Sequence, residues 1–350
     1  MQSSNKKIKV SVLGKDNIGW SIDSDRKNTI AIFEKSADFE ITQNIFKADI
    51  IYSVWYDTLS RPYIFYPLIL LKNIKKVKFF AVITNNIENT PEKINKFKNL
   101  IDVWISPSSK TYNFIRKHAL ETIQIPFLVN KNIFSKLNKP KKELANLLEI
   151  DADKIENKIL IGSFQRDSLG DDLSRPKWQK NPELLIKIMK NIPREKSLLI
   201  LAGPRRHYIV NECRKLNIPY LFIGNERLID MNQDDINENN LSLEKINLLY
   251  NLIDVYLVTS KSEGGPKAIL EAALTKTLIF STNVGLASDI LDRTLIYDEK
   301  NFNMVIANIK KDANKEYPYA EEINSAFHKA TQVMDEKVIL NKIKNIFYEN

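Results

Sequence analysis

Residues 262–291, SEGGPKAILEAALTKTLIFSTNVGLASDIL, decide the fold together with the apolar run IDVYLVTS that precedes them at 253–260. A continuous run of apolar and β-branched residues is typical of a parallel strand buried on both faces. Gly264 and Gly265 allow close backbone approach, and Pro266 suits the first position of a helix, where its missing N–H costs nothing. The segment therefore predicts a strand, a glycine-rich turn and a helix. Free N–H groups at such a helix start favour phosphate or sugar hydroxyls.

Two carboxylates stand eight positions apart in this segment, Glu263 at the turn and Glu271 two helical turns along. A pair at this spacing is expected on the order of once by chance in a chain of this length, so the spacing alone decides nothing. With the strand, the turn, the helix, the next strand LIFST and the Val284-Gly285 turn, it resembles the E-x7-E signature of retaining GT-B glycosyltransferases of family 4, the group 1 transferases. The resemblance implies two Rossmann-like α/β domains facing a cleft and a nucleotide diphosphate sugar as co-substrate.

A second group of candidate residues follows the apolar run KILIGSF at 158–164. Arg166, Lys177 and Lys180 lie between that predicted strand and an amphipathic helix predicted over 182–192. Cations at the carboxyl end of a parallel strand lie where open α/β sheets bind ligands. The alternative is an exposed basic loop paired with its own aspartates. The resemblance implies that Arg166 and Lys180 grip the nucleotide diphosphate, with Lys177 as the weaker candidate.

The resemblance also implies the reaction: transfer of a sugar with retention of anomeric configuration, in cell-surface polysaccharide or glycolipid synthesis. Arg166, Lys180 and Glu263 are the predicted catalytic residues, because the cations stabilise charge on the leaving diphosphate and Glu263 positions the donor sugar. The leaving phosphate oxygen is the expected proton acceptor, and Glu271 is expected to bind the ribose. The predicted donor-binding residues are Gly264, Gly265, Pro266, Lys267, Glu271, Gly14 and Lys177.

Several positions depart from the family pattern. Asn85 and Asn86 stand where many members have a His after the third predicted strand. Gly265 stands where an aromatic residue is common, and LTKT at 274–277 lacks the usual Gly before the next strand. The last two departures leave the identity of the sugar open. Gly14 ends the first predicted strand, and its loop GKDNIGW is expected to bring backbone amides toward the donor phosphates.

The rest of the chain alternates short apolar runs with longer segments, which predicts doubly wound parallel sheets. Four strands are expected in the first half, at 8–14, 48–54, 78–84 and 102–108. A polar connection rich in Lys and containing Pro predicts a domain boundary near residue 140. We therefore predict an acceptor-binding domain over 1–140, a donor-binding domain over 141–330, and a C-terminal helix over 331–350, which the resemblance implies crosses back to the first domain.

Charge is distributed unevenly, because residues 1–142 carry 24 Lys+Arg against 12 Asp+Glu and residues 143–350 carry 28 against 31. The basic half shows no recognition-helix pattern, zinc finger or RNP-like strand, so nucleic acid is not the predicted partner. A phosphorylated acceptor or peripheral contact with an anionic membrane fits the charge better, and the acceptor that the resemblance implies is a glycan or a lipid-linked molecule. A solvated lysine-rich surface is the alternative.

The cysteine count and the hydropathy pattern exclude several classes of protein. The single cysteine, Cys213, excludes an internal disulfide and a cysteine metal cluster, and the three histidines show no ligand spacing. The apolar run PYIFYPLILL at 62–71 is too short to span a membrane, so it is either a core helix or a surface patch. No apolar segment precedes the first strand, so the expectation is a cytoplasmic protein, peripheral on the inner membrane face if it contacts a membrane at all.

Two D-x-D triplets raise the question of a metal. Asp23 and Asp25 are expected in a polar helix-entry loop, and Asp151 and Asp153 beside a helix end, whereas a metal-dependent transferase needs the triplet at the end of a central strand. We therefore predict no metal and no cofactor. Two alternative functions stay open: a GT-B-type UDP-sugar epimerase and a non-catalytic nucleotide-sugar-binding protein.

Overall fold

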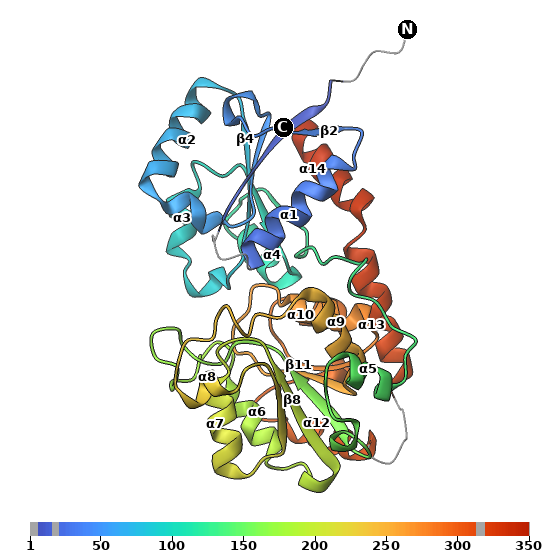
Figure 1. Ribbon diagram of the computed structural model, residues 1–350. Coiled ribbons are helices and arrows are strands. Elements are labelled where there is room, and N and C mark those ends of the chain that lie inside the picture. Colours follow the sequence, from blue (N-terminus) through green and yellow to red (C-terminus); the bar gives the residue numbers. More distant parts are fainter. Residues whose placement is uncertain (1–5, 16–20, 313–318, 350) are drawn as a thin grey trace. The chain divides into compact units, whose positions relative to one another are not determined.

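The computed structural model describes residues 6–15, 21–312 and 319–349. The chain divides into two compact units, which we call unit 1 (Met1–Val129 with Gln332–Asn350) and unit 2 (Asn130–Thr331). Figure 1 shows the chain coloured from blue to red, and the red C-terminal helix α14 lies beside the blue helix α1 of unit 1. Each unit is built on its own parallel sheet, so the predicted α/β class is confirmed.

Unit 1 has a six-stranded parallel sheet with the strand order β2-β1-β3-β4-β5-β6. The strands are β1 Ile8–Leu13, β2 Phe39–Ile41, β3 Ile50–Ser53, β4 Lys78–Val82, β5 Val103–Ser106 and β6 Thr122–Gln124. Four of them, β1, β3, β4 and β5, lie within the apolar runs that predicted them. Strands β2 and β6 have three residues each, and no apolar run of strand length marks them in the sequence.

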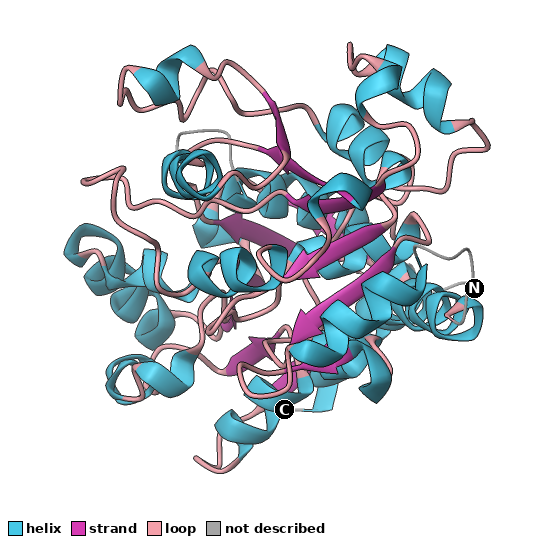
Figure 2. Cartoon of the chain, turned by 90° about the horizontal axis from the view of Figure 1, so that it is seen from below, coloured by secondary structure: helices cyan, strands magenta, loops and turns pink. Residues whose placement is uncertain are grey.

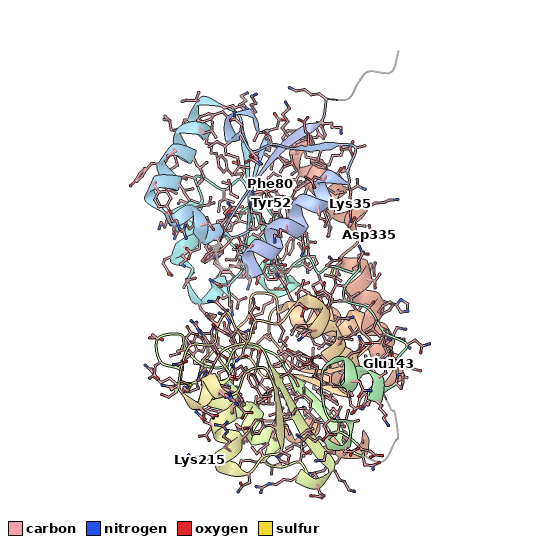
Figure 3. The ribbon with its side chains drawn as sticks, viewed as in Figure 1. Lys35, Tyr52, Phe80, Glu143, Lys215 and Asp335 are labelled. Atoms are coloured by element: carbon pink, nitrogen blue, oxygen red, sulfur yellow. The ribbon has the colours of Figure 1, made fainter. Side chains whose placement is uncertain are left out.

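Helices cover both faces of the unit 1 sheet. Helices α1 (Ser21–Glu34) and α14 (Glu336–Glu349) pack on one face, and α2 (Pro62–Ile74), α3 (Glu92–Phe97) and α4 (Ser109–Arg116) pack on the other. Tyr52 on β3 and Phe80 on β4 are partners in register and lie in the core on the α1 side (Figure 3). Short 3-10 helices η1 (Ile45–Lys47), η2 (Tyr56–Ser60) and η3 (Ile87–Asn89) complete the unit.

The last helix is fixed to unit 1 by apolar and ionic contacts. Ile339 and Ile343 of α14 are buried in the core of unit 1. The Lys35 ammonium lies 2.9 Å from a Glu336 carboxylate oxygen, and the Lys342 ammonium donates to the Gln124 carbonyl at 3.0 Å. The chain therefore ends in the unit in which it begins.

Unit 2 has a second six-stranded parallel sheet, with the order β12-β11-β10-β7-β8-β9. The strands are β7 Ile159–Ser163, β8 Ser197–Ala202, β9 Tyr220–Ile223, β10 Val255–Val258, β11 Leu278–Thr282 and β12 Ile296–Tyr297. The chain moves from β7 to β8 on one side, and later returns to place β10 on the other side of β7. The gap between β7 and β10 is thus a topological switch point, where open α/β sheets bind ligands at the carboxyl ends of their strands.

The helices of unit 2 form two groups. Helix α6 packs with α7 and α12, and α9 packs with α5 and α10. In Figure 2 the strands are magenta and lie among the cyan helices. The helices are α5 Lys141–Leu147, α6 Pro182–Met189, α7 His207–Leu216, α8 Arg227–Asp230, α9 Leu243–Leu252, α10 Lys267–Leu274, α11 Ala287–Ile290, α12 Asn303–Asp312 and α13 Ala320–Val333, with 3-10 helices η4 Ala152–Lys154, η5 Arg194–Lys196 and η6 Arg293–Leu295.

The connection between the units packs on unit 2. The backbone N–H of Ser135 donates to the Asn247 side-chain oxygen at 3.2 Å, and that of Leu137 donates to Asn251 at 2.7 Å. Phe134 is buried, with its ring 6.1 Å from that of Tyr250. These contacts explain why the division between the units falls after Val129. The polar composition predicted a domain boundary near residue 140, about ten residues later.

This division changes how the charge is assigned. Unit 1 carries 22 Lys+Arg against 15 Asp+Glu, and unit 2 carries 30 against 28. The basic segment that follows residue 130 contributes to unit 2 rather than to unit 1. The charge argument for a membrane or phosphorylated partner of unit 1 is therefore weaker than the count over residues 1–142 suggests.

Candidate functional site

The glycine-rich turn follows β10 and leads into α10. Gly264, Gly265 and Pro266 are buried. The sequence predicted Pro266 as the first helical residue of α10, whereas in the structure it is the N-cap residue, one position earlier. Gly285, in the turn after β11, has φ +50°, and a Cβ there would lie 2.8 Å from Pro266 Cδ and 2.9 Å from the Gly264 carbonyl oxygen. The two turns are thus packed together so closely that position 285 requires glycine.

The loop between β7 and α6 returns to the carboxyl end of β10. Thr259 Oγ1 donates to the Lys180 carbonyl at 3.0 Å, and the Lys261 N–H donates to the Gln179 carbonyl at 2.8 Å. Ser260 Oγ lies 3.2 Å from Gln165 Oε1. These bonds join the loops of two adjacent strands at the switch point, and they place the predicted residues of both loops in one site.

Three cations and one carboxylate meet in this site. Lys180 forms an ion pair with Glu263, and Ser260 Oγ donates to the same carboxylate oxygen of Glu263 at 2.9 Å. The pKa of Lys177 is lowered to about 8, chiefly by burial and then by the charges of Arg166 and Lys180. The structure therefore brings Arg166, Lys177, Lys180 and Glu263 together, with an excess of positive charge that a diphosphate would balance.

Glu271 lies on α10 and is held by a tyrosine that the sequence did not indicate. The Tyr250 hydroxyl, from α9, donates to Glu271 Oε2 at 3.0 Å. The Tyr250 ring is buried, with ring centroids 5.1 Å from Tyr256 and 5.2 Å from Phe164. Burial raises the pKa of Tyr250 well above its usual value, so the phenol stays protonated and serves as a donor that fixes the carboxylate.

A buried ion pair supports the loop after β7. Arg206 Nε lies 2.7 Å from Asp167 Oδ2, and neither side chain reaches solvent. Arg206 also donates to Ser163 Oγ at 3.2 Å and to the Gln165 carbonyl. Burial raises the pKa of Asp167 to about 6, and the charge of Arg206 opposes that shift. Asp167 is therefore a fixed part of the fold. The alternative that the loop is exposed and that its cations pair with its own aspartates does not hold for Asp167, which is buried and pairs with Arg206.

Gly14 is the one predicted site residue in unit 1. Its φ is +116°, and a Cβ there would lie 2.6 Å from Val54 Cγ2, so the end of β1 requires glycine. Residues 16–20 of its predicted phosphate loop lie outside the described residues. Asn86, which stands at a family His position, caps η3 by accepting from the Glu88 N–H at 3.3 Å.

The described residues contain no group of three or more His, Cys, Asp and Glu side chains that could hold a metal ion. Asp23 and Asp25 lie inside helix α1 rather than in a loop before it, which corrects their predicted place. Asp151 is the N-cap residue of η4 and accepts from the Asp153 N–H at 3.1 Å. Within the described ranges, no helix combines the length and apolar character needed to cross a membrane.

A cavity of about 210 Å³ opens elsewhere in unit 2, where β10 and β11 begin. It is lined by basic, polar and apolar side chains: Lys136, Lys139, Lys141, Asn251, Ile253, Asp254, Lys276, Thr277, Leu278, Tyr319 and Ile323. The candidate residues lie instead after the carboxyl ends of the strands, where the turn N–H groups and the cations converge. We therefore place the site at that edge.

No protein-family model and no curated protein matches this sequence. Among solved structures, the chain is similar to HepE from Anabaena, crystallised with UDP and glucose, at 14% identity and a TM-score of 0.70 over 98% of this chain and 100% of that one. It is also similar to a glycosyltransferase from Rickettsia africae, at 17% identity and a TM-score of 0.67 over 99% and 98%. Sucrose-phosphate synthase from Thermosynechococcus elongatus aligns at 12% identity and a TM-score of 0.67 over 98% and 99%. With the two parallel sheets, these likenesses show that the chain has the GT-B fold that the sequence predicted.

Proposed function

We propose that this protein is a retaining glycosyltransferase, which moves a sugar from a nucleotide diphosphate sugar to a glycan or lipid-linked acceptor in cell-surface polysaccharide or glycolipid synthesis. The observation that carries the proposal is the cluster of Arg166, Lys177 and Lys180 around Glu263, at the switch point between β7 and β10. HepE, which has a similar fold, was crystallised with UDP-glucose, and this supports a nucleotide sugar as the donor. Retention rests on the resemblance to family 4.

The cations would act on the leaving group. As the glycosidic bond breaks, negative charge grows on the diphosphate, and charge-assisted contacts from Arg166 and Lys180 strengthen with it. Backbone N–H groups of Gly264, Gly265 and Lys267 at the start of α10 would add to this stabilisation. In this mechanism the leaving phosphate oxygen accepts the acceptor's proton, and no metal or protein base is required.

The two glutamates would contact different parts of the donor. Glu263 is paired with Lys180, so donor binding would draw Lys180 to the diphosphate and release the Glu263 carboxylate for the sugar hydroxyls. Glu271, held by Tyr250 at 3.0 Å, would accept from the ribose hydroxyls. Each contact fixes the pose of one part of the donor, and positioning of this kind can supply several kcal/mol of the barrier reduction.

The first experiment is a thermal-shift screen of UDP-, GDP- and dTDP-sugars with the full chain. A ligand at a hundred times its Kd adds about 2.7 kcal/mol of stability, so the correct donor should be evident. NMR of the product of the best donor then gives the anomeric configuration. Binding without any turnover would favour the non-catalytic alternative, and an inverted product would contradict retention.

Substitutions test the assigned roles. Lys180→Ala and Arg166→Ala should each lower kcat on the order of 10² or more, because their contacts strengthen in the transition state. Glu271→Ala should mainly raise the donor KM, because ribose contacts are equal in ground and transition states. Lys196→Ala, on exposed η5, is the control. Near parental kcat/KM in all three site variants would refute the donor site and the functional proposal.

A further inference from the structure

Helix α2 of unit 1 is apolar on both its buried and its exposed face. Its sequence, PYIFYPLILLKNI, contains no acidic residue. Leu68 and Leu71 are buried in the core on one side of the sheet, and Ile64, Phe65 and Ile69 pack partly against the same core. A helix that is apolar all round is normally covered on every side, so the face of α2 turned to solvent requires an explanation.

The exposed face is built from large side chains at helical spacing. Tyr63, Tyr66, Leu70 and Ile74 follow one another at intervals of three or four residues, which places them on one side of the helix. The Lys75 ammonium donates to the Phe46 carbonyl at 2.8 Å, so η1 lies beside the end of α2. We call Phe46, Tyr63, Tyr66, Leu70 and Ile74 the α2 face; their side chains are between 60% and 77% exposed. A contiguous apolar surface of this kind marks an interaction site.

Basic residues stand at both ends of the α2 face. Arg61 precedes the helix, and Lys47 and Lys76 are exposed near its other end. Lys75 donates to two backbone carbonyls. A second copy of the chain packed on this face would bring cations against cations whichever way the helices crossed. An anionic surface would instead meet favourable charge at both ends.

The chemistry of the α2 face matches the boundary of a lipid bilayer. Leu70 and Ile74 supply apolar area, and Tyr63 and Tyr66 combine an apolar ring with a hydroxyl that can stay in the headgroup layer. Lysines around such a helix contact anionic headgroups while their stems cover apolar surface. Figure 1 shows α2 on the side of the unit 1 sheet away from α1 and α14.

We propose that the α2 face docks unit 1 on an anionic membrane, with α2 lying in the interface and not crossing the bilayer. This deepens the proposed function, on which it rests only for its purpose: a lipid-linked acceptor would be met at that surface. The docking itself uses no residue of the donor site. The two proposals can therefore fail separately.

Co-sedimentation of the full chain with vesicles tests the docking. Vesicles of equimolar phosphatidylglycerol and phosphatidylcholine should bind the parent protein, and pure phosphatidylcholine should bind it more weakly. The double variant Leu70→Gln/Ile74→Gln should lose binding by tenfold or more, because two exposed apolar anchors are removed. Leu147→Gln/Met231→Gln removes two exposed apolar residues of unit 2 and is the matched control, which should bind like the parent.

Charge and oligomeric state provide the remaining readouts. Lys47→Gln/Lys76→Gln should weaken binding to the phosphatidylglycerol vesicles, with little effect on phosphatidylcholine. Parental vesicle binding by Leu70→Gln/Ile74→Gln would overturn the proposal. A second outcome would also overturn it: the parent binds no vesicles and forms a dimer that dissociates on dilution, while Leu70→Gln/Ile74→Gln forms no dimer. The α2 face would then be covered by a second copy of the chain. Donor-induced thermal shifts should be the same in all these variants; a missing shift in every one would contradict the proposed function and leave the docking standing.

Discussion

Raising the pH above 8 should weaken donor binding through one side chain, Lys177. Its pKa is lowered from 10.5 to about 8 by burial and by the neighbouring charges of Arg166 and Lys180. A bound diphosphate would offset those charges and move the pKa of Lys177 back toward its usual value. Because the bound form then holds its proton more tightly than the free form, binding above pH 8 must take up a proton.

The pKa values set the size of the effect. With a pKa of about 8, roughly nine-tenths of free Lys177 is protonated at pH 7 and roughly one-tenth at pH 9. If the bound form stays protonated, the donor Kd should rise about fivefold to tenfold between these pH values, the lower figure allowing for solvent screening of a partly exposed group. The intact nucleotide sugar is the correct probe, because its diphosphate diester does not titrate in this range.

Calorimetry in buffers of different ionisation enthalpy measures both quantities. The parent should take up close to one proton at pH 9 and almost none at pH 7. Lys177→Arg keeps the charge at every pH, so it should bind with little pH dependence and without proton uptake. Lys177→Met should bind weakly at both values. If the pH dependence persisted in Lys177→Arg, another group would be responsible and the reasoning about Lys177 would be wrong.

Three further predictions follow from local geometry and from the proposed chemistry. Gly285→Ala should raise the donor KM on the order of tenfold, measured by steady-state kinetics, because the new Cβ would meet Pro266 and the Gly264 carbonyl at a backbone position that disfavours alanine. Ala119→Gly should raise the unfolding free energy in urea by about 1 kcal/mol, because Ala119 has φ +54°, whereas Ala31→Gly inside α1 should lower it by about as much. Transfer activity should survive EDTA, and a complete loss restored by manganese would contradict the metal-free mechanism.

Local sequence was enough to predict the parallel sheets because most strands coincide with apolar runs, and the GT-B fold came from the resemblance to the family motif. The exceptions, β2, β6 and β12, have three, three and two residues, too few to show a period. The missing glycine in LTKT also has a structural account. Lys276 has φ +56°, so a lysine adopts the left-handed backbone that glycine would adopt without strain after α10.

The site was predictable only where its residues lie close together in the sequence. Glu263 and Glu271 belong to one strand-turn-helix unit, and Lys180 lies two residues before α6, so the local sequence and its resemblance to the family motif were enough to propose them. Tyr250 and Arg206 come from other elements, and their partners lie 21 and 39 positions away in the chain. In the sequence, Tyr250 looks like an ordinary core residue of an amphipathic helix. Pairings of this kind depend on the tertiary fold and leave no local pattern.

The two ion pairs of the site differ in what a ligand can do to them. Arg206 and Asp167 are fully buried, and breaking that pair by removing one partner would cost about 3–5 kcal/mol, so it serves as a fixed support for the loop after β7. Lys180 and Glu263 are 21% and 16% exposed, so solvent and a ligand can reach this pair. In the proposed function a diphosphate would take Lys180 from Glu263, because it offers a stronger charge-assisted bond in return. This exchange would leave a carboxylate beside the sugar only when a donor is bound, and it would link binding of the diphosphate to correct placement of the sugar.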